Sequence, residues 1–307
     1  MEISVIICTH NPRLAYLQRV LDSLCTQSID SSKWELLLID NCSEAHIKDH
    51  VDVSWHKRGK IIAEPQLGLT HARLRGIRES KSEILCFVDD DNVLDPGYLE
   101  QALKIGTTMP HIGCWGGEIA GEYEAPPPPW FKGYEGMLVI RPLIRDAWGN
   151  AYRYDDAMPC GAGMCVRRAV VDHYLRMCEQ TPLRKSLDRS GTSMASAGDI
   201  DLAYTAIDLG MGTGRFTAMQ MLHLIPAGRL DSDYLIRLAE GMAESDIYLH
   251  YFRCPDLAGY TARLPILTRI QFWCDCFRAP KHRRRMLMAQ RRGRRRAIQR
   301  LRDMRCA

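Results

Sequence analysis

The sequence predicts an α/β fold: a mainly parallel sheet flanked by helices, followed by a helical and strongly basic C-terminal extension. Two observations carry this prediction. Short apolar runs alternate with segments of helical period through the first 120 residues, and strands separated by helices form parallel sheets. Positive charge gathers near the C-terminus, where residues 278–305 carry a net charge of +12 against −8 for the remainder. An acidic body joined to a basic tail indicates two separate tasks.

Five short apolar runs are the expected strands, at residues 3–8, 34–40, 60–64, 83–88 and 111–119. Segments with an apolar residue every three or four positions are the expected helices, at 14–27, 68–80, 95–106, 161–178, 198–210 and 231–252. The helix within 161–178 is expected to follow a glycine turn, and Thr70 is the expected N-cap of the second helix. The segment "YEAPPPPW" is expected to form a polyproline-like loop beside the sheet.

We expect one domain over residues 1–250 and the basic extension over 251–307. No run approaches the roughly 18 apolar residues of a spanning helix. The N-terminus, "MEISVIICTHN", has no basic segment, so it is predicted to be a strand and not a signal peptide. The twelve cysteines are scattered, which favours reduced thiols in a cytosolic protein over a zinc site.

Three adjacent carboxylates follow the fourth expected strand, in "FVDDDN". They are Asp89, Asp90 and Asp91. Parallel sheets bind ligands beyond the carboxyl ends of their strands, so these acids are expected at a binding edge. Mg²⁺ or Mn²⁺ binds through one or two carboxylates together with phosphate oxygens, and such a cation would offset the repulsion. The alternative is a solvated loop of helix-capping aspartates, a role that Asp95 already fills.

A set of motifs now gives the sequence a resemblance. In order, they are "VIICTHN", "LLLIDNCS", "GLTHARLRGI", "FVDDDN", "GAGM" and "GDIDL". This order resembles the GT-A-fold, family 2 glycosyltransferases over residues 3–230, and it implies their Rossmann-like sheet. "GCWGGEI", the proline-tryptophan loop and "HLIPAGRL" look like bacterial enzymes of cell-surface polysaccharide assembly.

The resemblance implies roles for particular residues. Those that match donor-binding positions are Thr9, His10, Asn11, Asp40, Arg73, Asp89 and Asp90. Asp40 matches the acid that hydrogen-bonds uracil, so a UDP-sugar is the favoured donor. Those that match metal-binding positions are Asp89, Asp91 and His223, with Mn²⁺ or Mg²⁺ as the cofactor. For His223, a core histidine bonded to backbone is the alternative.

Asp199 matches the family's general base. Gly198 stands where a glutamate is usual, so Asp201 remains a rival. A diphosphate leaving group needs charge stabilisation, and a sugar hydroxyl needs a base. One base opposite the leaving group predicts single displacement with inversion, to a hydroxyl of a glycan or lipid-linked acceptor.

Several residues keep two readings. The glycines of "GCWGGEI" and Gly161 to Gly163 either approach the donor sugar or form bends. Trp115 and Trp130 either stack on sugars or pack in the core. Arg229 either meets the diphosphate or supports its loop.

The extension predicts a membrane contact. Ile266, Ile270, Trp273 and Phe277 share one helical face, and arginine clusters follow at 283–285, 291–292 and 294–296. This suits an anionic bilayer surface and places the protein in the cytoplasm or on the inner face of the cell membrane. The alternatives are a solvated helix or a nucleic-acid contact, and no nucleic-acid fold supports the latter.

Three other functions are alternatives to sugar transfer. A nucleotidylyltransferase would open with a glycine-rich loop, whereas "THNPR" follows the first strand here. A non-catalytic nucleotide-sugar-binding protein would bind donor without turnover. A dinucleotide oxidoreductase needs G-x-G-x-x-G after the first strand, and none is present there.

Overall fold

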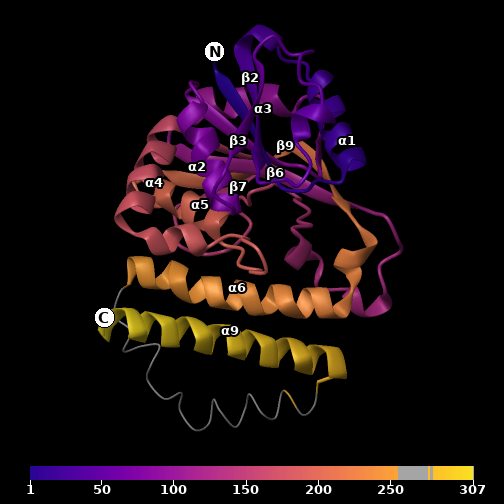
Figure 1. Ribbon diagram of the computed structural model, residues 1–307. Coiled ribbons are helices and arrows are strands. Elements are labelled where there is room, and N and C mark those ends of the chain that lie inside the picture. Colours follow the sequence, from indigo (N-terminus) through magenta and orange to yellow (C-terminus); the bar gives the residue numbers. More distant parts are fainter. Residues whose placement is uncertain (255–275, 277–278, 307) are drawn as a thin grey trace.

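The computed structural model describes residues 1–254, 276 and 279–306. Within these residues one nine-stranded sheet runs in the order β3-β2-β1-β4-β8-β6-β9-β5, and β7 pairs with β9. The strands are β1 Ile3–Thr9, β2 Trp34–Asn41, β3 Gly59–Glu64, β4 Ile84–Asp89, β5 Asn92–Leu94, β6 Ile112–Tyr123, β7 Ala147–Gly149, β8 Met164–Arg167 and β9 Gly212–Ile225. The helices are α1 Leu14–Cys25, α2 Leu69–Glu79, α3 Tyr98–Thr108, α4 Arg168–Gln180, α5 Gly198–Asp208, α6 Ser232–Arg253 and α9 Lys281–Cys306. The expected α/β architecture and helical C-terminal extension are confirmed (Figure 1).

The sheet divides into a parallel part and a mixed part. Strands β1, β2, β3 and β4 are parallel to one another, as the βαβ pattern predicts. Beyond β4, strand β8 is antiparallel to both β4 and β6, and only β6 with β9 is a further parallel pair. The parallel part therefore brings several carboxyl strand ends to one edge, while the mixed part extends the sheet sideways.

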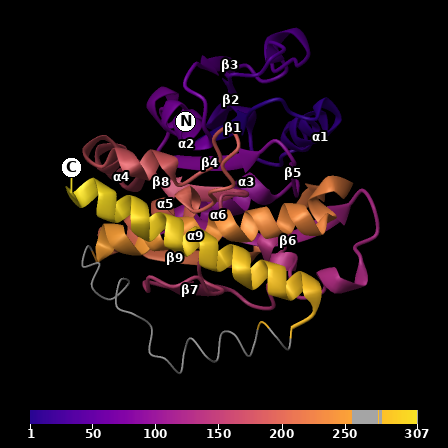
Figure 2. The same cartoon turned by 60° about the horizontal axis from the view of Figure 1, so that its bottom comes forward.

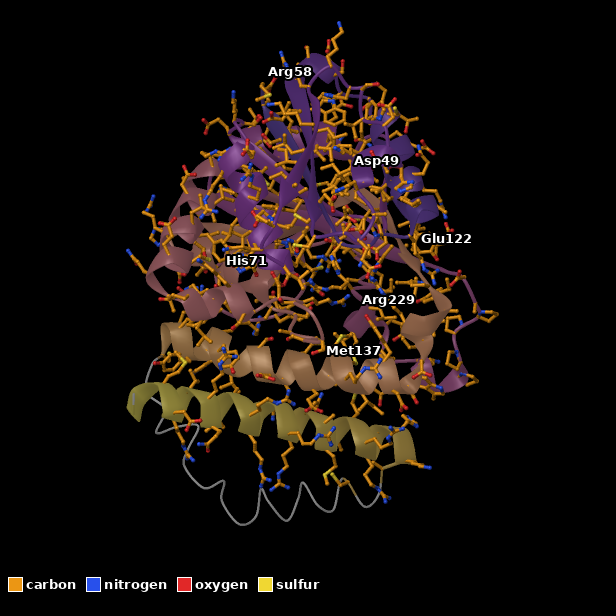
Figure 3. All side chains as sticks on the ribbon, in the orientation of Figure 1. Asp49, Arg58, His71, Glu122, Met137 and Arg229 are labelled. Carbon is orange, nitrogen blue, oxygen red and sulfur yellow. The ribbon has the colours of Figure 1, made fainter. Side chains whose placement is uncertain are left out.

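Both faces of the sheet are covered by helices. Alternate β1 side chains point to opposite sides: Val5 and Ile7 pack with α1 and α3, and Ile6 packs with α2, α4 and α5. Because a parallel strand buried on both faces needs mostly apolar residues, β1 and β2 are apolar along most of their length, and the buried Ser4 and Glu35 are hydrogen-bonded to each other. Figure 3 shows the side chains filling the space between the sheet and its helices.

Several expected boundaries are wrong in an informative way. The N-cap of α2 is Gly68, whose φ of 139° suits glycine, and Thr70 lies inside the helix. Strand β8 occupies 164–167, within the segment expected to be turn and helix. Strand β9 was not predicted, because its glycine-rich start resembles the end of a helix. Its first five residues, including the polar Thr213 and Arg215, are all buried, so they show no alternation between polar and apolar side chains.

The "GCWGGEI" segment lies in the sheet interior. Trp115 is fully buried, which confirms the core reading for this residue. The β6–β9 register shifts between Gly117 and Glu118, and a Cβ on Gly117 would collide with the carbonyl oxygen of Met219. Gly117 thus serves a β-bulge. Trp130 packs with residues of α6 and its surroundings, in contact with His282.

Helix α9 packs along α6 beneath the sheet (Figures 1 and 2). Met286, Ala289, Ala297 and Leu301 are buried, and a Cβ on Gly293 would collide with the Glu240 carbonyl, so the two backbones approach closely. The predicted boundary at residue 250 falls inside α6 and stays a prediction. The apolar face predicted over 266–277 lies outside the described residues.

Across residues 1–254 and 279–306, no helix is both long enough and apolar enough to cross a bilayer.

Candidate active site

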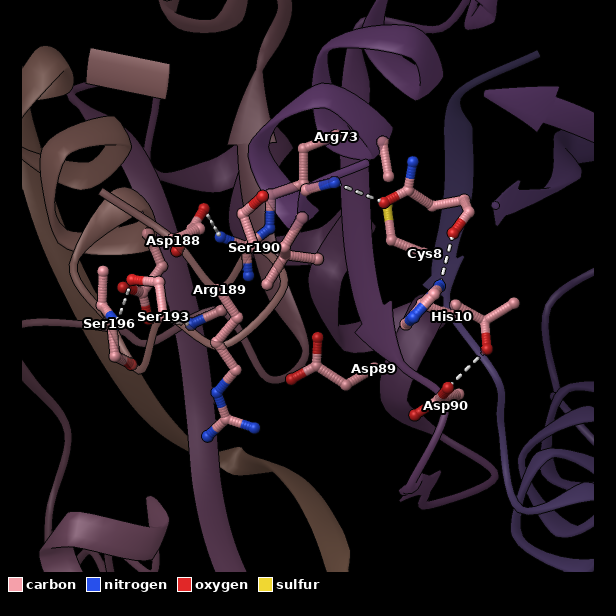
Figure 4. Close-up of a pocket in the computed structure, with 18 of the residues that line it drawn as sticks. Cys8, His10, Arg73, Asp89, Asp90, Asp188, Arg189, Ser190, Ser193 and Ser196 are labelled. Carbon is pink, nitrogen blue, oxygen red and sulfur yellow. Dashed lines mark hydrogen bonds and ion pairs between the residues drawn. The ribbon is translucent and has the colours of Figure 1, made fainter. Parts of the chain in front are cut away.

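A cavity of about 370 Å³ opens at the carboxyl ends of β1, β2 and β4. It is lined from the other side by the loop that precedes α5 and by residues of β9 and the segment after it (Figure 4). The carboxyl edge of a parallel sheet is where the sequence places the site. Eight predicted site residues line this cavity: Thr9, His10, Arg73, Asp89, Asp90, Asp91, Asp199 and His223.

Asn11 and Asp40 do not line the cavity, and they connect neighbouring loops. The carboxylate of Asp40 accepts hydrogen bonds from the backbone N–H groups of Ser43, at 3.2 Å, and Ile47, at 3.4 Å. The side-chain oxygen of Asn11 accepts from the Glu44 N–H at 2.8 Å. Asn41 takes the place beside the cavity, where its Oδ1 accepts from the Gly68 N–H at 2.8 Å. The contacts with a nucleotide base that the resemblance implies for Asn11 and Asp40 stay predictions.

The three adjacent carboxylates have separate partners within the protein. Asp90 accepts a hydrogen bond from the Thr9 hydroxyl. Burial and the neighbouring Asp91 raise the pKa of Asp90 to about 7. Burial also raises the pKa of Asp89, although the Arg73 guanidinium opposes it. The side chains therefore do not share a single solvated loop, and the capping alternative fails for these acids.

Asp91 is the acid that is held ionised. Its Oδ2 lies 2.9 Å from Nη2 of Arg229 and 3.4 Å from Nε2 of His223. Burial acts to raise the pKa of Asp91, but His223 and Arg229 outweigh it and the pKa falls to about 2. Figure 3 shows Arg229 between the sheet and α6. Part of the charge that the sequence assigned to a bound cation is therefore supplied by the protein itself.

His223 has the orientation of a metal-binding histidine. Its Nδ1–H donates to the Leu138 carbonyl oxygen at 2.8 Å, and its Nε2 accepts from Nη1 of Arg229 at 3.0 Å. Pairing of β5 with β9 sets His223 opposite Asn92, the residue after Asp91. The backbone bond expected of a core histidine is therefore present, and the ring nitrogen that a metal ion would need faces the cavity side chains and is occupied by Arg229.

The donor set suits a hard divalent cation, but the site is not assembled for one. Carboxylate and imidazole ligands fit Mn²⁺, and Asp89, Asp91 and His223 line the same cavity. Arg229 bonds both Asp91 and Nε2 of His223, the latter at 3.0 Å. Among the described residues, no group of three or more potential ligands is already close enough to hold a metal ion.

Asp199 and Asp201 have different environments, although both begin α5. Asp199 lines the cavity, and its Oδ2 accepts from the Gly161 N–H at 2.7 Å. Asp201 is fully buried, and its carboxylate is bound by Arg184 at 2.5 Å and by Arg253 at 2.9 Å. A carboxylate occupied by two guanidinium groups outside the cavity is not placed to take a substrate proton. Asp201 is therefore excluded as the rival base.

Sequence reasoning missed Asp188 and Arg189. Asp188 is buried and accepts from Arg73 Nη1 at 3.0 Å, from the Thr70 hydroxyl at 2.9 Å and from the Gly198 N–H at 3.1 Å. The neighbouring Arg189 lines the cavity. The only sequence signal is a polar, serine-rich stretch directly before "GDIDL", and such a stretch is typical of any surface loop.

Comparison with known proteins now identifies the chain. Residues 4–175 match the family described as glycosyl transferase family 2, and they make up more than half of the sequence. The chain belongs to glycosyl transferase family 2. The D-x-D acids, Arg73 and the loop after β1 all lie within the matched span, whereas Asp199 and His223 lie beyond it.

Curated relatives of this family 2 chain match it only in part. An uncharacterized glycosyltransferase of Haemophilus influenzae is 32% identical over 111 residues, which cover 36% of this chain and 36% of the relative. The glycosyltransferase AglE of Haloferax volcanii is 29% identical over 116 residues, or 36% of this chain and 38% of the relative. The matched spans cover about a third of the length of the curated relatives.

Solved structures show the same fold. A mannosyltransferase from Pyrobaculum calidifontis, PcManGT, has a TM-score of 0.57 at 15% identity, covering 97% of this chain and 87% of that one. GalNAc-T7 has a TM-score of 0.51 at 15% identity, covering 82% and 50%. These likenesses establish the GT-A fold that the sequence predicts.

The assignments of Asp201 and Asp199 can be separated by stability. Asp201→Asn leaves Arg184 and Arg253 buried without a full counter-charge, so we expect the free energy of unfolding to fall by about 3 kcal/mol. Asp199→Asn keeps an acceptor for the Gly161 N–H, and we expect a change below about 1 kcal/mol. Urea denaturation followed by circular dichroism measures both. Equal losses for the two variants would contradict the structural role of Asp201.

Proposed function

We propose that this protein is an inverting glycosyltransferase, which moves a sugar from a nucleotide-sugar donor, with UDP favoured, to a hydroxyl of a glycan or lipid-linked acceptor. One observation carries the proposal: a half-buried acid, Asp199, lines the same cavity as the triple carboxylate, at the carboxyl edge of the sheet. The reaction needs a carboxylate that takes the proton of the acceptor hydroxyl and a group of side chains that hold the donor diphosphate.

The donor half of the site is formed by the loops after β1, β2 and β4. His10 Nδ1 lies 2.7 Å from the Asn41 carbonyl oxygen, which fixes the ring at the cavity wall. Thr9 is tied to Asp90, so the first loop and the carboxylate loop form one surface. We propose that the nucleoside lies against this surface, with Asp40 behind it.

A divalent cation, Mn²⁺ or Mg²⁺, is proposed to complete the donor site. PcManGT was solved with GDP-Man and Mn²⁺, which supports a metal in this fold. Asp89, Asp91 and His223 would hold the ion here, and bound there it would neutralise charge on the departing diphosphate. Because Arg229 occupies Asp91 and His223, it has to move from that pair when the ion binds.

Asp199 is proposed as the general base. Its Oδ2 is fixed by the Gly161 N–H, while its Oδ1 is bonded only to the adjacent Ile200 N–H at 2.8 Å. Each oxygen of this carboxylate accepts from a backbone donor and keeps a further lone pair for a proton. It would take the proton of the acceptor hydroxyl as the hydroxyl oxygen attacks the anomeric carbon. Attack opposite the diphosphate gives inversion in one step.

The acceptor is proposed to be presented at an anionic membrane surface, as in the assembly of surface polysaccharides. Four exposed arginines of α9 have no partner among the described residues: Arg283, Arg294, Arg295 and Arg302. Other α9 arginines pair with α6, such as Arg292 and Arg296 with Glu240. The paired residues hold the helix in place, and the unpaired ones offer charge to phospholipid head groups. This arrangement favours a peripheral protein of the cytoplasmic face.

Donor binding is predicted to depend on a divalent metal ion. We expect a UDP-sugar to raise the melting temperature more with Mn²⁺ than without it, because a ligand of the folded state stabilises it. Asp91→Asn and His223→Gln are expected to remove the Mn²⁺ increment. Scanning fluorimetry with a panel of sugar nucleotides measures this, and Asp172→Asn on α4 is the control. An equal shift with chelator and with Mn²⁺ would exclude the metal.

Replacing Asp199 is predicted to lower turnover without preventing donor binding. We expect Asp199→Asn to lower the turnover number by about 10²- to 10⁴-fold, because the proton acceptor is lost. Donor affinity should change less than about threefold, since Asp199 does not hold the nucleotide. Donor affinity by calorimetry and product formation by mass spectrometry report the two quantities. Unchanged turnover would remove Asp199 from the mechanism, and donor binding without transfer by the native chain would favour a non-catalytic binding protein.

The unpaired arginines of α9 are predicted to bind anionic membranes. Changing Arg283, Arg294, Arg295 and Arg302 together to Gln should lower the partition onto vesicles with anionic lipid by at least about tenfold, since each basic residue near the surface contributes about 1 kcal/mol. The control removes the same charge elsewhere, through Lys48, Lys57, Lys104 and Arg145, which are exposed on the body. Co-sedimentation measures bound protein, and equal losses in both variants would reject a specific α9 surface.

A further inference from the structure

The cavity contains an arginine whose guanidinium forms no ion pair among the described residues. Three arginines line it: Arg73, Arg189 and Arg229. Arg73 pairs with Asp188, and Arg229 pairs with Asp91. The half-buried Arg189 side chain makes no hydrogen bond or ion pair within the described part of the chain, and its charge acts on Asp91 only from a distance. A partly desolvated guanidinium without a partner is unfavourable unless it faces an anion that binds later.

The direction of Arg189 is visible in Figure 4. Its side chain leaves the loop before α5 and extends into the cavity on the side of Asp89. It therefore faces the carboxylates from the opposite wall and does not contact them. A ligand that enters between the two walls would touch Arg189 on one side and the proposed cation site on the other.

The backbone of Arg189 is fixed, so this direction is built into the fold. Its carbonyl oxygen accepts from the Leu69 N–H at 3.0 Å, at the start of α2. The preceding Asp188 is bonded to Arg73, Thr70 and Gly198. The following Ser190 donates from its hydroxyl to the Leu67 carbonyl oxygen at 3.1 Å. Three successive residues are anchored, and only the Arg189 side chain is left to reach a ligand.

We propose that Arg189 binds the diphosphate of the donor, opposite the metal-binding carboxylates. This inference rests on the proposed function and names a residue outside the matched motifs. Guanidinium binds phosphate oxygens in a bidentate manner. A donor diphosphate brings negative charge next to five aspartates of the cavity lining, and a guanidinium without an ion pair on the opposite wall adds to the charge that the proposed metal ion supplies. The same contact stabilises the charge that develops when the sugar–phosphate bond breaks.

The test compares ligands that differ only in phosphate. Titration calorimetry in Mn²⁺ is done with UDP, GDP and dTDP, and the tightest binder of the native chain is compared with its monophosphate and its nucleoside. Arg189→Gln is expected to lower diphosphate affinity by about tenfold or more, because a hydrogen bond to a charged group is lost. Nucleoside affinity should stay within about twofold, and Arg189→Lys should restore part of the loss. Arg145→Gln removes the same charge from an exposed site outside the cavity lining and is the control.

Each outcome decides between defined alternatives. A loss confined to phosphate-bearing ligands supports the contact. A parallel loss for diphosphate and nucleoside means that Arg189 acts on the loop, and it overturns the proposal, as does an unchanged diphosphate affinity. If the native chain binds no nucleoside diphosphate, the proposed function fails as well. If it binds one and Arg189→Gln has no effect, the proposed function stands and only the role of Arg189 is rejected.

Discussion

The buried carboxylate of Asp188 is the interaction on which the geometry of the cavity depends. It joins Arg73 and Thr70 of α2 to the first N–H of α5. Asp188 thus links these two helices, which also share one hydrophobic cluster. Arg73, held in this way, acts on Asp89 and lies beside Gly161, whose N–H orients Asp199. The cavity wall around Asp89 and the orientation of Asp199 therefore both depend on one buried charge pair, which is rigid because both partners are desolvated.

The protein itself stabilises part of the charge of the aspartates after β4. Arg229 and His223 contribute to lowering the pKa of Asp91, the Thr9 hydroxyl donates to Asp90, and Arg73 opposes the rise in the pKa of Asp89. Burial nevertheless raises the pKa of Asp89 and Asp90, so these two acids are only partly compensated. Under the proposed function, a donor and its ion would replace existing contacts of these acids.

The parallel half of the sheet and the polar strand ends with Thr9, His10 and the three aspartates could be predicted from sequence, because apolar runs and strand ends are local signals. Arg73, Asp199 and His223 were indicated only by the resemblance to a known family. Asp201 could not be judged, since its arginine partners, Arg184 and Arg253, are distant in sequence and their approach is a property of packing. Strand β9 was not predicted for a related reason. Its polar residues Thr213, Arg215 and His223 are buried by neighbouring strands, so polar residues occupy interior positions that the pattern expects to be apolar. Asp188 and Arg189 share a composition with ordinary loops, and only the contacts of the loop distinguish them.

The pairing of β5 with β9 has a consequence for how this protein can vary. His223 reaches Asp91 because it stands opposite Asn92 in a ladder where neighbouring side chains alternate between faces. Adding or removing one residue within β9 would rotate the imidazole to the far side of the sheet, although no ligand would have been replaced. The spacing within one strand is thus as much a part of the site as the side chains themselves.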